Sequence, residues 1–410
     1  MGFAPLFKST FVEFDMMSYY LINFLFIFAI FFNTGCAQTL RGTLIFEPDP
    51  SKHGHTHASC IIECPDGDLL ACWYEGETER SADVHIQAAR LTKGKDTWSE
   101  AFLLADTPTL SDNNPCMIID NQDRLWLFYF TLLGSPEEAW ETAFIRYKIS
   151  THYQDQSKPI VWDVETDLPI KPNALDETMD KLCQEMMLNS NDDPQMLKTC
   201  DHLETQLNNQ LARKLGWTIR AHPIILSSET LLLPMASEVF AVAAMAMTSD
   251  CGKTWTFSKP LFGNGVEQPT VFERTDGILV AYLRDATLTR RIRMSQSNDA
   301  GFTWSPITNT DFPNPGSGVE VLRLSSGNIA LIYNDCAVHP RNSLAISMSD
   351  DEVKTWKWTR HIERVPGDQG RFDYPSIIQT RDGMIHATYS YNIQTIKHVV
   401  FTEEWIKAGD

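Results

Sequence analysis

The chain has 410 residues, of which 43% are hydrophobic, and it carries a formal net charge of −19 at pH 7. A chain of this length can bury a substantial core, and its strong negative charge argues against a nucleic-acid partner. The nine cysteines are scattered without the spacing of metal ligands, so the sequence predicts neither a metal site nor a cofactor.

The N-terminal part of the chain contains an apolar run, residues 21–32. It is short for a membrane span and has the length of a signal-peptide core. Gly35 directly precedes Cys36, an arrangement that resembles the lipidation site of bacterial lipoproteins. We therefore expect residues 1–36 to direct export to the periplasm, the outer membrane or the medium. Membrane attachment through a lipidated Cys36, plain secretion and a retained anchor remain the alternatives.

A hairpin pattern recurs six times between positions 58 and 390. In each copy, an apolar run of strand length leads to a turn, and a second apolar run follows. The turns lie near positions 67, 123, 229, 277, 327 and 383, with one gap about twice as long as the others. Repeats of this size stack radially in β-propellers. The sequence therefore predicts an all-β fold, a six-bladed β-propeller over residues 40–410.

The long gap between the second and third hairpins contains residues 173–215, which are rich in Leu, Met, Gln, Asp and Asn. Apolar residues such as Met179 and Met186 recur there at helical spacing, so we expect a helical insertion within one blade or between two. Cys183 and Cys200 lie in this insertion and could form a disulfide in an oxidising compartment. The sequence leaves this pairing open.

A loop of the form Ser/Thr-x-Asp-x-Gly-x-Thr-Trp occurs at residues 248–255, 297–304 and 349–356, the last with Val353 in the glycine position. An aspartate in a tight loop accepts backbone N–H bonds, so we expect these carboxylates to be turn caps. The loops resemble the Asp-boxes of the sialidase (neuraminidase) superfamily, whose members are six-bladed propellers. The resemblance covers nearly all of the chain after residue 40. It implies fold more than function, because non-enzymes also carry Asp-boxes.

The repeats allow equivalent positions to be compared between blades. Nine or ten residues before each turn lies the start of the first strand, and about seven residues after it lies the end of the second. Because antiparallel strands bring these ends together, both sets should surround one mouth of the central channel. The first set is His57, Asn114, Arg220, Glu267, Gly318 and Tyr374, and the second is Tyr74, Phe130, Ser237, Arg284, Asn334 and Ser390.

The sialidase resemblance implies a catalytic pair at this mouth. The segment Phe-Asp-Tyr-Pro-Ser at residues 372–376 resembles the family segment that carries the nucleophilic tyrosine, here Tyr374. Glu267 resembles the family glutamate that takes the tyrosine's proton, with Arg284 following seventeen residues later. A neutral nucleophile suits an anomeric carbon that bears a carboxylate. The structural alternative is a tyrosine that caps the channel beside a Glu267–Arg284 salt bridge.

The acid/base group is predicted by the segment Ser-Ala-Asp-Val-His-Ile, in which Asp83 resembles the family aspartate that protonates the leaving oxygen. The alternative is a solvated loop aspartate, in which case Glu75, Glu77 or Glu79 could serve instead.

Arginines bind carboxylates through bidentate hydrogen bonds. The resemblance implies that Arg284 and Arg341 are the second and third arginines of the sialidase triad. The place of the first reads Thr-His-Ala-Ser around His57, so that arginine is missing, and Arg220 could complete a different clamp. This departure leaves a uronic acid as an alternative to sialic acid. Asn334 completes the predicted substrate-binding set.

Three functions follow from these residues. The first is an exported exo-glycosidase of sialidase type that removes a terminal acidic sugar from glycans. The second is a hydrolase or lyase acting on uronic-acid glycans, with His57 or His222 as acid or base. The third is a non-catalytic propeller that binds a glycan or a protein.

Overall fold

The computed structural model describes residues 39–49, 51, 54–134, 140–189, 194–263, 265–367 and 369–410, and Leu40–Asp410 form one compact unit. The predicted export segment, with Cys36, lies outside the described residues. Among the residues that are described, no helix is long and apolar enough to cross a membrane.

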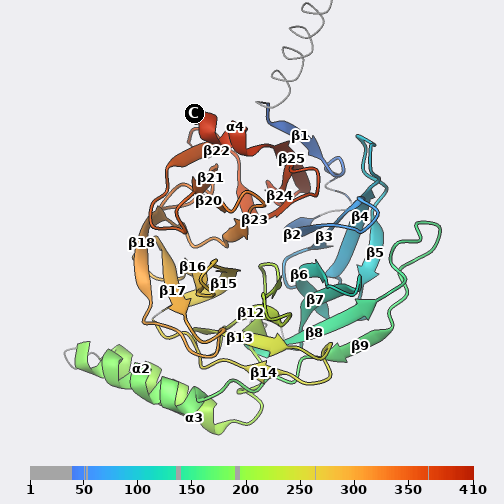
Figure 1. Cartoon of the computed structure of the whole chain (residues 1–410). Helices are drawn as coiled ribbons and strands as arrows, with labels where there is room; N and C mark the ends of the chain where they lie inside the picture. The colour runs from blue at the N-terminus through green and yellow to red at the C-terminus, as the bar shows by residue number, and fades with distance from the viewer. Residues whose placement is uncertain are drawn as a thin grey trace, which may run out of the picture. The chain divides into compact units, whose positions relative to one another are not determined.

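The compact unit consists of six antiparallel sheets arranged around a common centre, as a six-bladed β-propeller requires (Figure 1). The first blade comprises β2 (His55–Glu63), β3 (Leu69–Gly76), β4 (His85–Leu91) and β5 (Phe102–Ala105). The second comprises β6 (Ser111–Ile119), β7 (Leu125–Leu132), β8 (Ala143–Ser150) and β9 (Val164–Asp167), with the 3-10 turn η1 (Trp140–Thr142) before β8. The third comprises β10 (Trp217–Thr218), β11 (Ile224–Ile225), β12 (Leu231–Ser237), β13 (Val242–Thr248) and β14 (Thr256–Phe257).

The remaining three blades follow in chain order. The fourth comprises β15 (Val266–Glu273), β16 (Leu279–Asp285), β17 (Arg291–Ser297) and β18 (Thr308–Pro313). The fifth comprises β19 (Glu320–Arg323), β20 (Ile329–Asn334), β21 (Ser343–Ser349) and β22 (Trp358–Arg364). The sixth comprises β23 (Phe372–Gln379), β24 (Ile385–Tyr391), β25 (Thr395–Phe401) and β1 (Arg41–Leu44), and the short helix α4 (Glu403–Ala408) follows β25.

The ring is closed by the first strand of the chain. β1 pairs with β25, with Arg41 opposite Val400, so the sixth blade is built from both ends of the unit. This closure protects the edge that the last blade would otherwise expose. The sequence pattern predicts six hairpins but does not predict that β1 completes the sixth blade, because β1 has only four residues and one of them is apolar.

The second strand of each blade is buried on both faces because it lies between neighbouring sheets, and it therefore reads as a continuous apolar run. Every residue of β7 is buried, for example, whereas every residue of the outer strand β9 is exposed. The largest fully buried side chains include Trp73, Trp126 and Trp217, which fill the spaces between blades.

The predicted insertion is helical. It forms α2 (Leu175–Asn189) and α3 (Pro194–Asn208), which extend outward from the ring beside the third blade (Figure 1). Cys183 and Cys200 both remain free thiols, and the Cys200 Sγ lies 3.9 Å from the Cys183 carbonyl oxygen.

Four of the inner strands are interrupted by a register shift near the mouth. The shifts fall between His57 and Cys60, Asn113 and Cys116, Glu267 and Thr270, and Asp373 and Ser376. At each shift one non-glycine residue has a positive φ: Ala58, Asn114, Gln268 and Tyr374. This conformation costs an L-residue about 1 kcal/mol or more, and such strain is typical of functional sites.

The three aspartate loops lie at the opposite end of the blades, where the third strands end. In each loop the carboxylate accepts bonds from the Thr four residues later, as for Asp299 with the Thr303 N–H (2.9 Å) and hydroxyl (2.6 Å). Asp250 and Asp351 make the same pair of bonds. These aspartates are therefore turn caps. Val353 has a φ of 62° where the other two loops have glycine.

Candidate functional site

The observed register brings together the strand ends predicted for the first, fourth and sixth blades, whereas in the third blade Ser237 lies opposite Trp217 and not opposite Arg220. His57 lies opposite Tyr74 in the first blade, and Glu267 lies opposite Arg284 in the fourth. In the sixth blade Ser390 lies opposite Asp373, one residue before Tyr374. The comparison of repeats was thus accurate to within one residue in these blades.

Tyr374 contacts several of the polar residues that surround the mouth. Its hydroxyl accepts hydrogen bonds from Arg284 Nη1 (2.8 Å) and Gln268 Nε2 (3.2 Å). The guanidinium carbons of Arg220 and Arg341 each lie 5.5 Å from the centre of its ring. The phenol oxygen therefore sits among positive groups that would stabilise negative charge on it.

His57 packs against the ring of Tyr374. The two ring centroids are 4.4 Å apart, and His57 Nδ1 lies 2.9 Å from the Ser390 hydroxyl. Burial, followed by the positive charges of His55, Arg341 and Arg371, lowers the pKa of His57 well below its usual value. The imidazole is therefore neutral at physiological pH.

Glu267 contacts Arg284, which lies between it and Tyr374. Glu267 Oε2 is 3.2 Å from Arg284 Nε. Burial opposes the charge of Arg284, but Tyr374, Glu267 and Glu238 together raise its pKa above the ordinary value. Among the described contacts, no hydrogen bond joins Glu267 to Tyr374 directly. The guanidinium links the two residues of the predicted catalytic pair.

Glu238 is a further acidic residue of this mouth. Burial and then the neighbouring charge of Glu267 raise the pKa of Glu238 to about 7, although Arg284 acts in the opposite direction. The repeat comparison placed Ser237 at the mouth but missed the next residue, because β12 ends there and Glu238 belongs to the loop. Glu79, one of the alternative acids, accepts a hydrogen bond from Tyr74 Oη at 3.0 Å.

Arg341 and Arg371 share the buried carboxylate of Asp373. Arg341 Nη1 donates to Asp373 Oδ1 at 2.8 Å, and its Nη2 donates to the Gly316 carbonyl at 2.7 Å. Arg371 donates to the other oxygen of Asp373 and has the more exposed side chain, at 42% against 7%. Arg371 was not predicted from the sequence, because it lies outside the positions that the repeats relate. It is the more accessible of the two guanidinium groups.

Arg220 and Asn334 are both held by backbone carbonyls. Arg220 Nη2 donates to the carbonyls of Pro375 (2.6 Å) and Val319 (3.2 Å). Asn334 is fully buried, and its amide nitrogen donates to three carbonyls, including that of Phe372 at 2.8 Å. Both side chains therefore fix the backbone on either side of Tyr374.

Asp83 lies in the exposed loop between β3 and β4. Its Oδ2 accepts a hydrogen bond from the Glu77 N–H at 2.9 Å, and its carbonyl contacts the His85 ring. The loop leaves from the mouth end of β3, so Asp83 belongs to the predicted side of the molecule. His222, the alternative acid or base, contacts Glu320 between the inner strands.

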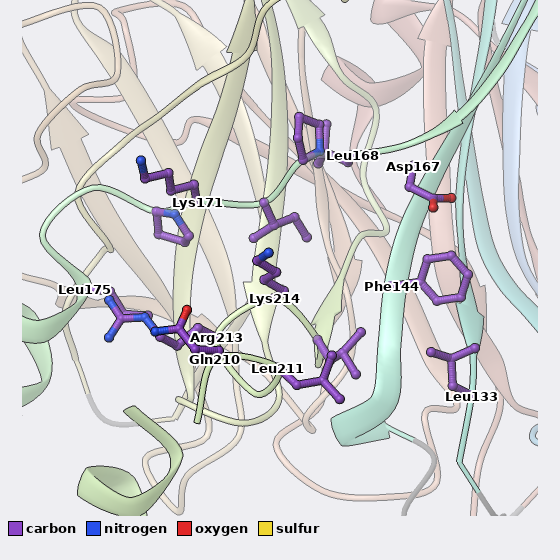
Figure 2. A pocket seen from close by; sticks show the side chains of 14 residues that line it. Leu133, Phe144, Asp167, Leu168, Lys171, Leu175, Gln210, Leu211, Arg213 and Lys214 are labelled. Atoms are coloured by element: carbon purple, nitrogen blue, oxygen red, sulfur yellow. The ribbon is translucent and has the colours of Figure 1, made fainter. Parts of the chain in front are cut away.

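A separate groove of about 1000 Å³ lies beside the helical insertion (Figure 2). Leu133 and Phe144 from the second blade line it together with Leu211, and Lys171 and Lys214 also contribute. It is lined by none of the predicted catalytic residues, so it is distinct from the mouth. The described residues contain no group of three or more His, Cys, Asp or Glu that could hold a metal ion.

Comparisons with known proteins agree with this architecture. The BNR repeat-like domain model matches residues 67–387. A sialidase of Micromonospora viridifaciens is 22% identical over 173 residues, which are 40% of this chain and 26% of that protein. The chain thus matches about a quarter of that relative's length.

Solved structures of low sequence identity share the fold. A protein of unknown function from Dyadobacter fermentans is 16% identical with a TM-score of 0.64, covering 88% of this chain and 98% of that one. The NanB sialidase of Streptococcus pneumoniae, as its K499G mutant, is 12% identical with a TM-score of 0.64, covering 88% and 71%.

Proposed function

The chain belongs to the BNR repeat-like domain family, and we propose from this premise that it is a glycoside hydrolase that removes a terminal acidic sugar from glycans. The observation that carries the proposal is the setting of Tyr374. The backbone of this residue is strained at φ 50°, and its hydroxyl receives hydrogen bonds from Arg284 and Gln268. Strain and converging donors at one hydroxyl are typical of an activated nucleophile.

In this proposal Tyr374 Oη attacks the anomeric carbon while the bond to the leaving oxygen breaks. The phenol proton passes to Glu267 directly or through one water, and Arg284 stabilises the negative charge that develops on Tyr374. Water then hydrolyses the glycosyl–tyrosine bond and regenerates the phenol. A tyrosine nucleophile is an established exception to the usual carboxylate pair of glycosidases.

The leaving oxygen needs a proton, and two carboxyl groups can supply it. Asp83 has the support of the sequence resemblance. Glu238 has the support of its pKa, which at about 7 keeps a donor proton available at neutral pH. We retain Asp83 as the proposed acid/base group, with Glu238 as the competing donor that a pH profile separates from it.

The substrate's carboxylate is proposed to bind at the mouth through Arg284, with Arg371 as its accessible neighbour. Arg341 and Arg220 are placed to act through Tyr374 and its backbone, because Arg341 Nη1 binds Asp373 and Arg220 Nη2 binds the Pro375 carbonyl. His57 occupies the position of the missing first arginine. A uronic acid is therefore a competing substrate, since it offers a carboxylate at a different place on the sugar ring.

The test is turnover of two fluorogenic substrates, an α-sialoside and a β-glucuronide, by the full chain and by Tyr374→Phe. Release from the α-sialoside by the wild type alone supports the sialidase reaction. The uronic-acid reaction would replace the sialidase reaction if only the β-glucuronide is hydrolysed, with this activity retained in Tyr374→Phe and lost in His57→Ala. Binding of acidic glycans without any turnover would support the third function, that of a non-catalytic propeller.

We also propose that the chain is exported, on the basis of the apolar run at residues 21–32 and of Cys36. Fractionation of cells that make the full chain, with labelled palmitate and a Cys36→Ser variant, tests this. Recovery of the protein in the cytoplasm at its full length would contradict export.

A further inference from the structure

A group of ionisable side chains lies between the inner strands and takes no part in the proposed reaction of Tyr374. Cys60 comes from β2, His222 precedes β11 and Glu320 begins β19. Cys60 Sγ lies 3.2 Å from His222 Nε2, and His222 Nδ1 lies 2.8 Å from Glu320 Oε1. Three blades thus contribute a thiol, an imidazole and a carboxylate to one connected site.

The hydrogen bonds of His222 require a proton on both ring nitrogens. Nδ1 faces the Glu320 carboxylate, and Nε2 lies 2.8 Å from the carbonyl oxygen of Ile61, which can only accept. Glu320 also accepts the N–H groups of His222 (2.7 Å) and Ile377 (2.9 Å), so it is ionised. His222 is therefore an imidazolium held in place by a buried carboxylate.

Cys60 is the acceptor that this imidazolium faces. Its sulfur also receives the backbone N–H of Met117 at 3.2 Å. Burial alone would raise the pKa of Cys60, but a hydrogen bond from Cys72 and the charge of His222 lower it to about 5. These donors converge on one sulfur and stabilise it as a thiolate.

Cys72 is placed to form a disulfide with Cys60. The two residues lie directly opposite each other in the β2–β3 pair, so their side chains are on the same face of the sheet. The Cα–Cα separation of such pairs lies within the range of disulfides. Burial and the neighbouring Cys60 raise the pKa of Cys72 well above its usual value, so only one thiol of the pair is ionised.

Access to the site limits the reagent to a small one. Cys60 is 1% exposed and Cys72 is fully buried, but the His222 side chain is 15% exposed. Solvent therefore reaches the imidazole that contacts the thiolate. A reagent that reaches Cys60 must therefore be about as small as water, as hydrogen peroxide is, and an aromatic disulfide reagent is too large.

We propose that Cys60 is a peroxide-reactive thiolate and that Cys72 resolves its oxidised form to a disulfide. The Cys60 sulfur attacks one oxygen of hydrogen peroxide and the O–O bond breaks. The leaving hydroxide takes a proton from His222 and departs as water, which leaves a sulfenic acid on Cys60. The Cys72 sulfur then attacks Cys60 Sγ, the sulfenic hydroxyl leaves with the Cys72 proton as a second water, and the S–S bond forms.

The experiment treats the reduced full chain with hydrogen peroxide, alkylates the remaining thiols under denaturing conditions and identifies cysteine peptides by mass spectrometry. We expect a peptide cross-linked between Cys60 and Cys72 in the wild type. In Cys72→Ser, the sulfenic acid on Cys60 should be trapped by dimedone that is added together with the denaturant. In His222→Gln the reaction should slow by about tenfold or more, because the imidazolium is lost.

Cys64→Ser is the matched control, since Cys64 is also fully buried and its sulfur contacts Arg90 instead of His222. It should leave the cross-link and its rate unchanged. If His222→Gln fails to fold, the wild type and Cys72→Ser still decide the matter. Persistence of both thiols at peroxide concentrations that oxidise the less buried Cys251 or Cys336 would overturn the proposal. So would a cross-link between Cys60 and Cys116.

Discussion

The imidazole of His57 stacks on the phenol ring of Tyr374 at a centroid distance of 4.4 Å, with the ring planes inclined by 27°. The neutral His57 contributes no positive charge where the sialidase resemblance expects an arginine. The guanidinium groups around the phenol come instead from the third, fourth and fifth blades, through Arg220, Arg284 and Arg341. The proposed recognition of an acidic sugar therefore differs from that of the sialidase triad.

Tyr374→Phe should lower kcat by about 10³-fold or more on whichever acidic glycoside the wild type hydrolyses. The change removes only the hydroxyl that accepts from Arg284 and Gln268, and the ring keeps its packing against His57. Steady-state kinetics measure the effect, and a thermal melt close to that of the wild type would show that the fold is intact. Equal rates in the two proteins would exclude Tyr374 as the nucleophile.

Arg341→Ala should mainly lower the stability of the protein and Arg371→Ala should mainly weaken substrate binding, although both arginines bind Asp373. Arg341 is buried and Asp373 is fully buried, so Arg341→Ala leaves a poorly compensated charge and should cost about 3 kcal/mol of unfolding free energy. Loss of the half-exposed Arg371 side chain should cost less than about 1 kcal/mol of unfolding free energy, because water already screens its ion pair.

The same two variants make a kinetic comparison. We expect Arg371→Ala to raise KM for the acidic substrate with little change in its melting temperature. Denaturant unfolding and Michaelis–Menten curves measured side by side test this. Equal destabilisation of the two variants would contradict the assignment.

The hairpin repeats predicted much of this mouth because their spacing is a local property of the chain. The pairing of Glu267 with Arg284 follows from counting residues around one turn. The partners of Arg341 did not follow, because Asp373 belongs to the next blade and its contact depends on how the blades pack. Glu238 was missed for a related reason, since its raised pKa comes from burial and from Glu267 of another blade. The bulges that give Ala58 and Tyr374 a positive φ were also not predicted, because they do not change the pattern of apolar residues.

Gly318→Ala should disturb the site without altering any side chain that touches substrate. A Cβ at this position would lie 2.5 Å from Arg220 Cδ and 2.6 Å from its Nε. Arg220 would have to release the Pro375 carbonyl, and the backbone next to Tyr374 would lose its anchor. We expect a loss of about 1–3 kcal/mol in unfolding free energy together with reduced kcat.

Ser317→Ala is the control for this change. Its hydroxyl is buried without a hydrogen-bond partner among the described residues, so its removal should be nearly neutral. Chemical denaturation of the two variants gives the comparison. An unchanged unfolding free energy in Gly318→Ala would mean that the Arg220 side chain does not need the space beside the Gly318 Cα.

Asp351→Ala should destabilise the protein more than Asp350→Ala, although the two residues are adjacent. Asp351 accepts bonds from the Thr355 N–H and hydroxyl, whereas Asp350 makes a surface ion pair with Lys357. The Thr355 bonds lower the pKa of Asp351 from 3.8 to about 2. The stability that this carboxylate contributes is present above pH 3.8 and is lost as the pH falls through about 2. Melting temperatures at pH 7 and pH 2 should show a larger difference between the variants at the higher pH.

The pH dependence of turnover should identify the proton donor. Glu238 has a pKa of about 7, so its carboxyl is protonated below that pH and loses the donor proton above it. If Glu238 protonates the leaving oxygen, kcat falls as the pH rises through about 7, and Glu238→Gln removes both this limb and most of the rate. Asp83→Asn should then keep the limb. The reverse result, with the limb intact in Glu238→Gln and activity lost in Asp83→Asn, would assign the role to Asp83.

Glu238 also makes a prediction that is independent of any substrate. The pKa of Glu238 is raised from its ordinary value of 4.5 to about 7 by folding. The unfolded chain therefore gives up this proton at a lower pH than the folded chain does. The unfolding free energy should therefore decrease as the pH rises from about 4.5 to about 7, and Glu238→Gln should flatten the decrease. Urea unfolding across this range measures the slope. An unchanged slope in Glu238→Gln would show that another group titrates, and it would remove the support that the raised pKa gives to Glu238 as the donor.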